Sequence, residues 1–335
     1  MNHETMECAL CVHSVVMNKK EEPRRKLDRR FFAVSLFRER LSYMYWPCKK
    51  KSIIGLTLPT LSIYTVFIII PIGMAIYYSF TKYSGIGKPS FIGLQNYVRL
   101  FQDRIFWLSL KNTMIILAVD FILLMVAAFF VAILLNHRLK GVNFCKALIF
   151  SPAIIAPIIV GIIWVYILDP KIGILNAILF QLGLPTQQWI GGDIWSPYSI
   201  SFIYFWQQLG YIVTIYIAGL KMIPSDVVEA STIDGASDWQ RIRYVIFPMM
   251  RPQISTVAIL VITGVFKIFE IVQQTTNGGP NHMSETLVTY SYTTTFTKGE
   301  YGYGMCIAVL TFAVSLVIVA IYTRITGREE RRGRV

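Results

Sequence analysis

The chain has 335 residues, of which 54% are apolar and only 15% are charged, and its mean hydropathy is +0.53. Soluble globular chains carry about a quarter charged residues, so this composition excludes an ordinary soluble domain and predicts a membrane-embedded protein. The net charge of +13 would suit a nucleic-acid binder. The basic residues lie mainly between apolar runs, however, as the positive-inside rule expects. We therefore expect no nucleic acid as a partner.

Residues 1–51 are predicted to form a basic cytoplasmic tail, because they lack the apolar stretch and small-residue cleavage site of a signal peptide. Met17 precedes a Lys- and Arg-rich stretch and makes a more natural start than the first methionine. We therefore expect residues 1–16 to be untranslated or disordered. Cys8 and Cys11 form a C-x-x-C pair, but no second pair follows at zinc-site spacing. The five cysteines predict free thiols and no metal site.

Six apolar segments are long enough to cross a membrane as helices. Their approximate bounds are Ile53–Phe80, Asn112–Leu135, Ala147–Leu168, Tyr198–Leu220, Ile254–Val272 and Met305–Ile325. Together they predict an all-α, polytopic domain over residues 52–326, followed by a basic tail over 327–335. Prolines inside the first and third segments are acceptable, because neighbouring helices and water can satisfy the carbonyls that they free.

The distribution of basic residues predicts the orientation of the chain. Of the 32 Lys and Arg residues, 24 lie in the two tails and in segments 136–146 and 221–251. Only seven lie in the alternate loops, 81–111, 169–197 and 273–304. Both termini are therefore expected to be cytoplasmic.

The loops on the opposite side combine turn formers with aromatic residues. Asn277-Gly-Gly-Pro280 predicts a turn just beyond the fifth span. Trp189, Trp195 and Tyr198 lie near a predicted membrane interface, where aromatic rings are common. A membrane belt is favoured for these rings over contact with a substrate.

The cytoplasmic loop 223–248 is longer than a minimal connector and predicts two short helices. Ser225 is expected to cap the first helix, and Gly235 lies where a left-handed residue would follow its end. An S-x-x-Q capping box begins the second helix at Ser237. Pro248 is expected to end that helix or to bend it toward the fifth span. The loop therefore reads as a compact helical knob.

This knob has one apolar side and one acidic side. The apolar residues are Val227, Val228, Ala230 and Ile233, and the acidic ones are Glu229, Asp234 and Asp238. Residues 225–240 contain four acids and no base. Such a balance fits an anionic leaflet poorly, so a protein partner is favoured over lipid headgroups.

The motif Glu229-Ala-Ser-x-x-Asp-Gly-Ala, followed by Ile246-x-Pro248, resembles the EAA loop of binding-protein-dependent ABC importer permeases. One departure is Ser231, where a second alanine is usual, and serine is small enough for the same packing. The resemblance implies that the loop docks in a groove of a separate cytosolic ATPase. The coupling residues that it implies are Glu229, Ala230, Ser231, Asp234, Gly235, Ala236, Ile246 and Pro248.

Further segments, spread over about residues 52–326, resemble the carbohydrate-uptake branch of this family, of the maltose, multiple-sugar and glycerol-phosphate importer type. They are Phe91–Tyr97, Asn112-Thr113, Lys140-Gly141, Pro152, Trp164, Gly173-x-x-Asn176, Phe266–Glu270, Asn277–Pro280, Glu285–Leu287 and Tyr301–Gly304. The resemblance implies the type I importer permease fold in a bacterial inner or plasma membrane, and a carbohydrate as substrate.

The same resemblance implies the partners of the chain. They are a second homologous permease, two cytosolic ATP-binding subunits and an extracellular or periplasmic substrate-binding protein. No nucleotide-binding motif is present, because the Gly-Lys pair in residues 85–90 lacks the spacing of a P-loop. ATP and Mg²⁺ are therefore expected on the partner ATPase, with no cofactor and no catalytic residue on this chain. The implied mechanism is alternating access driven by ATP.

Candidate residues for the substrate pathway come from the third, fourth and fifth spans. Aromatic faces and amide groups suit a sugar, and the residues that offer them are Trp164, Tyr204, Trp206, Gln207 and Gln208. Lys267 and Glu270, at i and i+3 of the predicted fifth span, would share one helix face. Ionisable groups inside a membrane indicate a pathway or a paired site, and an ion pair near the helix end is an equal alternative. Asp120 is expected to hydrogen-bond across helices.

Two other classes of membrane protein fit the sequence less well. A secondary transporter or channel would work without an ATPase and would show an internal repeat with paired broken helices, which the sequence does not indicate. A membrane-embedded enzyme would need a catalytic cluster, yet only four histidines occur and no nucleophile elbow is present. The importer permease is therefore favoured.

Overall fold

The computed structural model describes residues 50–137, 140–192 and 194–332. The expectations for Met17, for the cysteine pair and for most of the amino-terminal tail lie outside these residues. The described chain is almost entirely helical, as predicted. Its elements are α3 (Lys50–Tyr64), the π-helix η2 (Thr65–Ile69), α4 (Ile70–Ser79), β1 (Thr81–Lys82), β2 (Ser90–Phe91), α5 (Gln95–Gln102), α6 (Arg104–Asn136), α7 (Val142–Ile154), α8 (Pro157–Leu168), α9 (Ile174–Gln181), α10 (Ser196–Leu220), α11 (Ser225–Ile233), α12 (Asp238–Arg241), the π-helix η3 (Ile242–Ile246), α13 (Phe247–Met249), α14 (Arg251–Val265), α15 (Glu270–Thr275), α16 (Leu287–Tyr292), the π-helix η4 (Thr293–Thr297) and α17 (Tyr301–Arg332).

The chain divides into two compact units, Met1–Pro71 and Ile72–Val335. The described part of the first unit is helical throughout, and the boundary falls inside the first apolar helix, Ile53–Ser79. The second unit contains every other element. Its two short strands form an antiparallel pair in which Thr81 lies opposite Phe91.

Of the three π-helices in the described residues, two end two residues before a proline. The π-helix η2 precedes Pro71, and η3 precedes Pro248. Proline lacks an N–H, and its ring clashes with the carbonyl four residues earlier in a regular α-helix. A wider turn just before the proline lets the chain stay helical at both places.

Four described helices are long and apolar enough to cross a membrane, and two bent helix pairs raise the number to six if each pair is one span. The six-span prediction is compatible with this result, but two spans are not the continuous helices that were expected. The helices α7 and α8 meet at 100°. The second bend, of 70° between Asp238–Met249 and α14, lies just before the predicted fifth span. The sequence did not indicate an internal repeat with paired broken helices, and the two bent pairs are visible only in the structure.

The predicted fifth span, Ile254–Val272, breaks after Val265. The amides of Lys267 and Ile268 bond to carbonyls three residues back, at 2.9 and 3.1 Å, and so tighten the last turn. The chain is then non-helical until α15 begins at Glu270. In the third span, Pro157 starts α8 after two extended residues.

Each break frees a backbone carbonyl that needs a donor, because lipid cannot supply one. At the first break, Gln207 Nε2 of α10 donates to the carbonyl of Ile155 at 3.0 Å. At the second, the Thr286 hydroxyl donates to the carbonyl of Ile268 at 3.3 Å. Side chains from other elements therefore satisfy both irregular segments.

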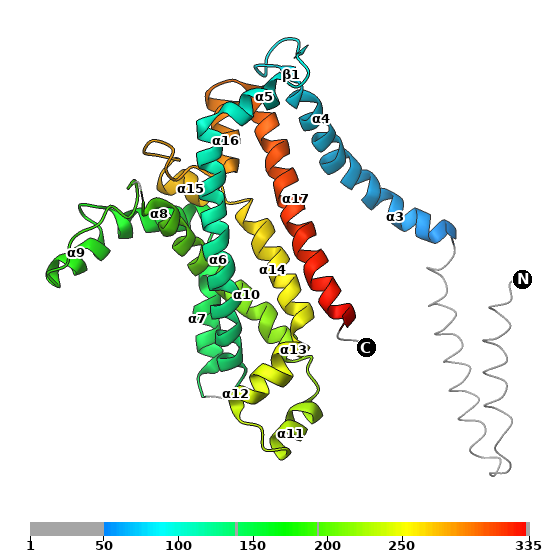
Figure 1. Ribbon diagram of the computed structural model, residues 1–335, viewed down its shortest axis with the longest axis vertical. Coiled ribbons are helices and arrows are strands. Elements are labelled where there is room, and N and C mark those ends of the chain that lie inside the picture. Colours follow the sequence, from blue (N-terminus) through cyan, green and yellow to red (C-terminus); the bar gives the residue numbers. More distant parts are fainter. Residues whose placement is uncertain (1–49, 138–139, 193, 333–335) are drawn as a thin grey trace, which may run out of the picture. The chain divides into compact units, whose positions relative to one another are not determined.

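The core of the second unit lies between α6, α10 and α14, with α14 between α6 and α17 (Figure 1). The fully buried ring of Tyr216 on α10 meets Phe129 of α6 edge-on, at 5.7 Å between ring centroids. Gly210 lets α10 cross α7 closely, because a Cβ atom there would lie 2.2 Å from the carbonyl oxygen of Ile149. These contacts hold α10 in the middle of the unit.

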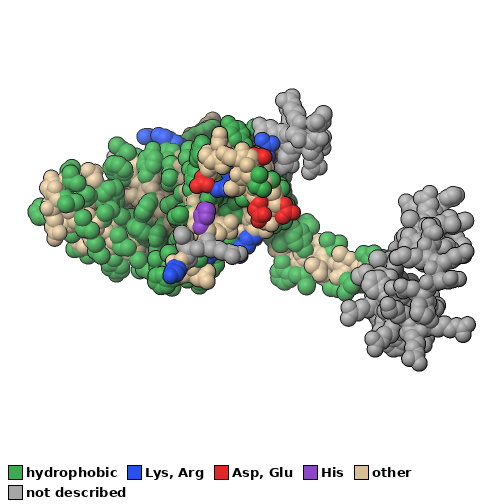
Figure 2. Space-filling model, turned by 90° about the horizontal axis from the view of Figure 1, so that it is seen from below, with side chains coloured by type: hydrophobic (Ala, Val, Ile, Leu, Met, Phe, Trp, Pro, Cys, Tyr) green, Lys and Arg blue, Asp and Glu red, His purple; other side chains and the backbone are tan. Residues whose placement is uncertain are grey.

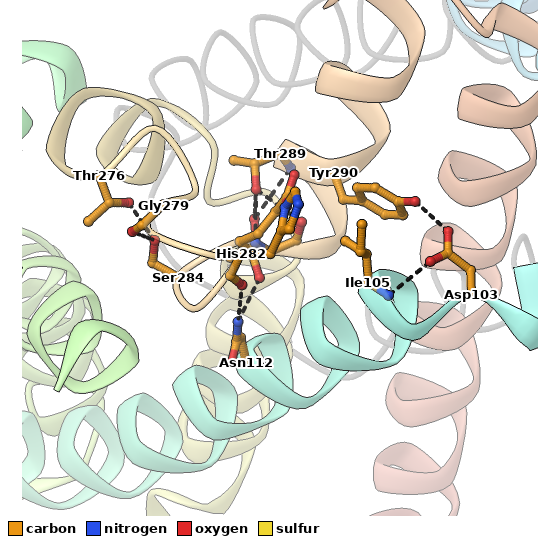
Figure 3. Close-up of polar contacts among 11 residues, drawn as sticks. Asp103, Ile105, Asn112, Thr276, Gly279, His282, Ser284, Thr289 and Tyr290 are labelled. Atoms are coloured by element: carbon orange, nitrogen blue, oxygen red, sulfur yellow. Dashed lines mark hydrogen bonds and ion pairs between the residues drawn. The ribbon is translucent and has the colours of Figure 1, made fainter. Parts of the chain in front are cut away.

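A polar network ties the start of α6 to α16 and to the loop before α16 (Figure 3). It also reaches Tyr303 of α17. Asp103 accepts hydrogen bonds from the hydroxyls of Tyr290 and Tyr303 and from the backbone amide of Ile105. Burial acts to raise the pKa of Asp103, but these hydrogen bonds outweigh it and lower the pKa below its ordinary value. The carboxylate is therefore charged at neutral pH, and its hydrogen bonds link the start of α6 to α16 and α17.

A second anchor of this end is Asn112 (Figure 3). Its side-chain amide donates to the backbone carbonyls of His282 and Glu285, at 3.2 and 3.1 Å. The turn predicted at Asn277-Gly-Gly-Pro280 is confirmed, with positive φ angles of 50° at Asn277 and 78° at Gly278. The loop between α15 and α16 is therefore an ordered part of the unit.

The hairpin β1–β2 and helix α11 lie at opposite ends of the second unit (Figure 1). Single cysteines introduced at Lys88 and Ser225, both exposed, in a cysteine-free background should therefore react with a membrane-impermeant maleimide from opposite sides. Labelling of right-side-out and inside-out vesicles measures this. Ser237→Cys is the control and should match the Ser225 variant. Reaction of the Lys88 and Ser225 variants from one side would contradict the six-span topology.

Candidate functional site

The first candidate site is the loop 223–248, where the structure confirms the glycine turn. Gly235 follows α11 with a φ of +79°. Its amide donates to the carbonyl of Thr232 at 3.1 Å, and the amide of Ala236 donates to that of Ser231 at 3.0 Å. These two bonds close the helix end in the Schellman pattern, which needs a left-handed residue at this position.

The start of α12 is also as predicted, whereas the start of α11 is not. The Ser237 hydroxyl accepts from the amide of Gln240 at 3.3 Å, and the Gln240 side chain accepts from the Ser237 amide at 2.8 Å. Ser225 was expected to be a cap, but it is the first helical residue, because extended Pro224 takes the capping position. Among the residues that the structure describes, its hydroxyl bonds only to Asp226. The cap prediction for Ser225 was wrong.

Pro248 neither ends the second helical segment nor marks its bend. It lies inside α13, and the 70° bend follows at Met250, which is fully buried. Pro252 then stands in the first turn of α14, where a missing N–H costs no helical hydrogen bond. The buried Met250 and the proline after it, rather than Pro248, separate the loop from the fifth span.

The loop presents both apolar and acidic side chains at the surface. Ile233, Trp239 and Tyr244 are 86%, 62% and 74% exposed. Among the coupling residues, Glu229, Ala230, Asp234 and Gly235 are exposed, Ala236, Ile246 and Pro248 are half-buried, and Ser231 is buried. Figure 2 views the molecule from this end and shows acidic side chains beside exposed hydrophobic ones. Large exposed apolar side chains of this kind mark an interaction surface.

The second candidate site is a cavity of about 320 Å³ where the two broken spans meet α10. Its walls come from α6, α8, α10, α14, α15 and the segment between the last two. The polar side chains that line it are Tyr204, Gln207, Gln208, Tyr211, Thr263, Lys267 and Glu270. The structure therefore brings five of the seven candidate pathway residues together, namely Tyr204, Gln207, Gln208, Lys267 and Glu270.

Lys267 and Glu270 line this cavity, but not in the way the sequence indicated. The prediction that they share one face of a continuous helix was wrong, because Lys267 lies in the break and Glu270 is the first residue of α15. Both are exposed. Within the described part of the chain, neither forms an ion pair. The cavity is therefore lined by one basic and one acidic side chain that are not paired with each other.

Gln207 has a structural role that the sequence did not indicate. It is 3% exposed, and its amide nitrogen is engaged by the carbonyl at the first break. Tyr211 and Thr263 line the cavity and were missed by sequence reasoning. Tyr204, Gln208 and Tyr211 follow one another at i, i+4 and i+7, the spacing of one helix face. That polar stripe is the signal that could have identified Tyr211.

Trp164 and Trp206 do not line this cavity. Their rings meet edge-on at 5.6 Å, and Trp164 also packs against Phe202 at 5.4 Å. Trp164 lines a separate, apolar cavity of about 540 Å³ together with Trp189, Trp195 and Tyr198. This position fits the aromatic belt favoured for the last three residues.

Asp120 lies on α6, fully buried and near Ser201 of α10. Neither oxygen of its carboxyl group has a partner at hydrogen-bonding geometry within the described residues. The expected hydrogen bond across helices is therefore not formed in this structure.

Comparison with known proteins identifies the class. Residues 142–331 match the family described as the binding-protein-dependent transport system inner membrane component. The chain belongs to this family. It is a multi-pass membrane protein and a permease subunit of an ABC importer, so the prediction of a transport subunit is confirmed.

Particular relatives cover most of the chain. One, 31% identical over 81% of this chain and 92% of its own length, is the probable starch degradation products transport system permease protein AmyD of Thermoanaerobacterium thermosulfurigenes. Another, 31% identical over 82% of this chain and 92% of its own length, is the trehalose/maltose transport system permease protein MalF of Thermococcus litoralis.

The fold is that of a solved importer. A chain in the crystal structure of a bacterial alginate ABC transporter, in complex with its alginate pentasaccharide-bound periplasmic protein, superposes with a TM-score of 0.73 at 21% identity. The match covers 84% of this chain and 96% of that chain. The predicted ABC importer permease fold is thereby confirmed.

The two serines of the loop offer a matched pair of substitutions. Ser237→Ala should cost about 1 kcal/mol of local stability, because it removes the cap of α12. Ser225→Ala should change little, since its hydroxyl caps nothing. Amide hydrogen exchange over residues 237–241 should quicken roughly fivefold in the first variant and stay unchanged in the second. Equal exchange in both variants would contradict the capping box.

Proposed function

We propose that this permease imports a carbohydrate, and that the solute passes through the cavity between the two broken spans. The cavity is the observation that carries the proposal. Hydroxyl, amide and charged groups from α10, from α14 and from the segment between α14 and α15 converge there with Glu270 of α15. Relatives named for transport of starch degradation products and of trehalose and maltose support a sugar.

The chemistry of the cavity suits a polyhydroxylated solute. Tyr204, Tyr211 and Thr263 can donate and accept hydrogen bonds, as sugar hydroxyls do. Lys267 and Glu270 add one free donor group and one free acceptor group of opposite charge. Hydrogen bonds to charged groups are stronger than neutral ones, so these two residues are proposed as the main contacts.

The loop 223–248 is proposed as the contact with a cytosolic ATPase. Its exposed apolar side chains and its acids need a partner surface, and its caps at Gly235 and Ser237 give it a defined shape. ATP and Mg²⁺ would bind on that ATPase. The loop continues through the bend at Met250 into α14, so movement of the docked loop would be carried to one wall of the cavity.

The assembly proposed around this chain has two such ATPases, a second homologous permease and a substrate-binding protein outside the membrane. Both termini would face the cytoplasm of a bacterial cell, as the distribution of basic residues predicts. Residues 52–326 would form the permease domain between two basic tails. ATP binding and hydrolysis would then alternate the access of the cavity between the two sides.

Removal of the cavity charges tests the pathway. Lys267→Met and Glu270→Gln should each lower sugar import by roughly tenfold or more, because a hydrogen bond to a charged group contributes about 1.5–3 kcal/mol. The importer is reconstituted in liposomes with its binding protein, and uptake of maltose, trehalose and maltotriose is measured. Lys171→Met is the control, since this exposed lysine lies outside the cavity. Wild-type uptake by both cavity variants would exclude these residues from the pathway.

Charge reversal on α11 tests the docking surface. Glu229→Lys should reduce co-purification of the ATPase and ATP-driven uptake together, while the protein still inserts in the membrane. Glu229→Gln keeps the shape of the side chain and should have a smaller effect. ATPase recovery and uptake at wild-type levels in the Lys variant would mean that the ATPase binds elsewhere.

A further inference from the structure

Gly264 of α14 and Tyr204 of α10 meet in the wall of the cavity at unusually short range. A Cβ atom built on Gly264 would lie 2.3 Å from the Tyr204 hydroxyl oxygen and 3.6 Å from Cζ of the same ring. Contacts under 3.0 Å are essentially never made by real Cβ atoms. The hydroxyl therefore occupies the space that any side chain at position 264 would need.

The backbone gives no other reason for this glycine. Gly264 lies inside α14 without a positive φ angle, where glycine costs roughly 0.5–1 kcal/mol relative to alanine. Gly235 is the opposite case, since its φ of +79° requires glycine while the space around it is open. Position 264 requires glycine because the Tyr204 hydroxyl leaves no room for a Cβ atom, and not because of its backbone conformation.

The hydroxyl itself is a group without a protein partner. The Tyr204 side chain is only 8% exposed, so the surrounding helices confine its ring. Among the side-chain hydrogen bonds of the described residues, none involves this hydroxyl, whereas its neighbour Gln207 is bonded. A buried tyrosine usually finds a partner for its O–H group. Here the open side of the residue is the cavity.

We propose that Gly264 is a positioning residue, which admits the Tyr204 hydroxyl to the cavity wall so that it can hydrogen-bond a hydroxyl group of the solute. This inference rests on the proposed function of the cavity. Gly264 stands one residue before the end of α14 and three before Lys267. The space at Gly264 therefore holds the Tyr204 hydroxyl near the end of α14, where Lys267 follows in the chain.

A double-mutant cycle in the assembled importer tests whether the Tyr204 hydroxyl is what excludes a side chain at position 264. The variants are Gly264→Ala, Tyr204→Phe and the two combined. Gly264→Ala should lower the melting temperature of the complex, because the new methyl group collides with the hydroxyl oxygen. Tyr204→Phe removes that oxygen and leaves a contact of 3.6 Å, which is ordinary packing. The combined variant should therefore regain the melting temperature of Tyr204→Phe.

The second measurement is the number of maltotriose molecules imported per ATP hydrolysed in liposomes. A structural defect alone would lower import and hydrolysis together and leave this ratio unchanged. Loss of the tyrosine hydroxyl should lower the ratio roughly fivefold in Tyr204→Phe and in the combined variant alike. Gly264→Ala should lower it as well, because the ring is displaced. Gly327→Ala is the control, since a Cβ atom there meets nothing within 4 Å.

Two results would overturn the inference. A combined variant that melts like Gly264→Ala would show that the hydroxyl is not what excludes a side chain. A wild-type ratio in Tyr204→Phe would show that the hydroxyl does not contact the solute. Failure of the proposed function looks different, because a wild-type complex that hydrolyses ATP would then import none of maltotriose, maltose and trehalose. In that case the proposed contact between the Tyr204 hydroxyl and the solute is wrong as well. The melting temperatures of the double-mutant cycle still decide whether Gly264 makes room for that hydroxyl.

Discussion

Lipid offers no hydrogen bond to a backbone carbonyl, so an irregular segment inside a membrane needs a donor from the protein or from water in a cavity. This constraint explains the centre of the molecule. The third and fifth spans both break, and Gln207 and Thr286 supply the donors that allow the breaks at Ile155 and Ile268. The cavity lies where these breaks meet α10. The position of this polar cavity among apolar helices therefore depends on two side chains that hydrogen-bond to backbone carbonyls.

The two ends of the second unit differ in the interactions that stabilise them and in the side chains that they expose. At one end, Asp103 and Asn112 tie helix ends and a loop into an ordered network whose polar groups are satisfied within the chain. At the other end, the loop 223–248 is well formed by its own caps but leaves Ile233, Trp239 and Tyr244 exposed. This loop continues through Met250 into α14, and α14 forms part of the cavity wall.

Local sequence signals predicted local structure well. The turn at Gly235 and the capping box at Ser237 were correct, because both depend on residues within a few positions of one another. The cap prediction for Ser225 was wrong because Pro224, in an extended conformation, takes the capping position. The fifth span was predicted to continue to Val272 because its residues are apolar, yet apolar composition cannot reveal a break whose carbonyl is satisfied by Thr286, a residue distant in sequence. For the same reason, the prediction that Lys267 and Glu270 share one helix face was wrong, because the helix is interrupted between Val265 and Glu270.

The sequence by itself determined that the chain spans a membrane several times, that it carries a capped loop between two spans and that it belongs among importer permeases. Apolar run length, helix caps and a contiguous motif carry that information, and all three are local. Only the tertiary structure decided which polar residues share one cavity, that Trp164 and Trp206 lie outside it and that Gln207 supports a break. These facts depend on the crossing of helices far apart in the chain, where a distance of a few ångströms, as between Gly264 and Tyr204, determines what each side chain can do.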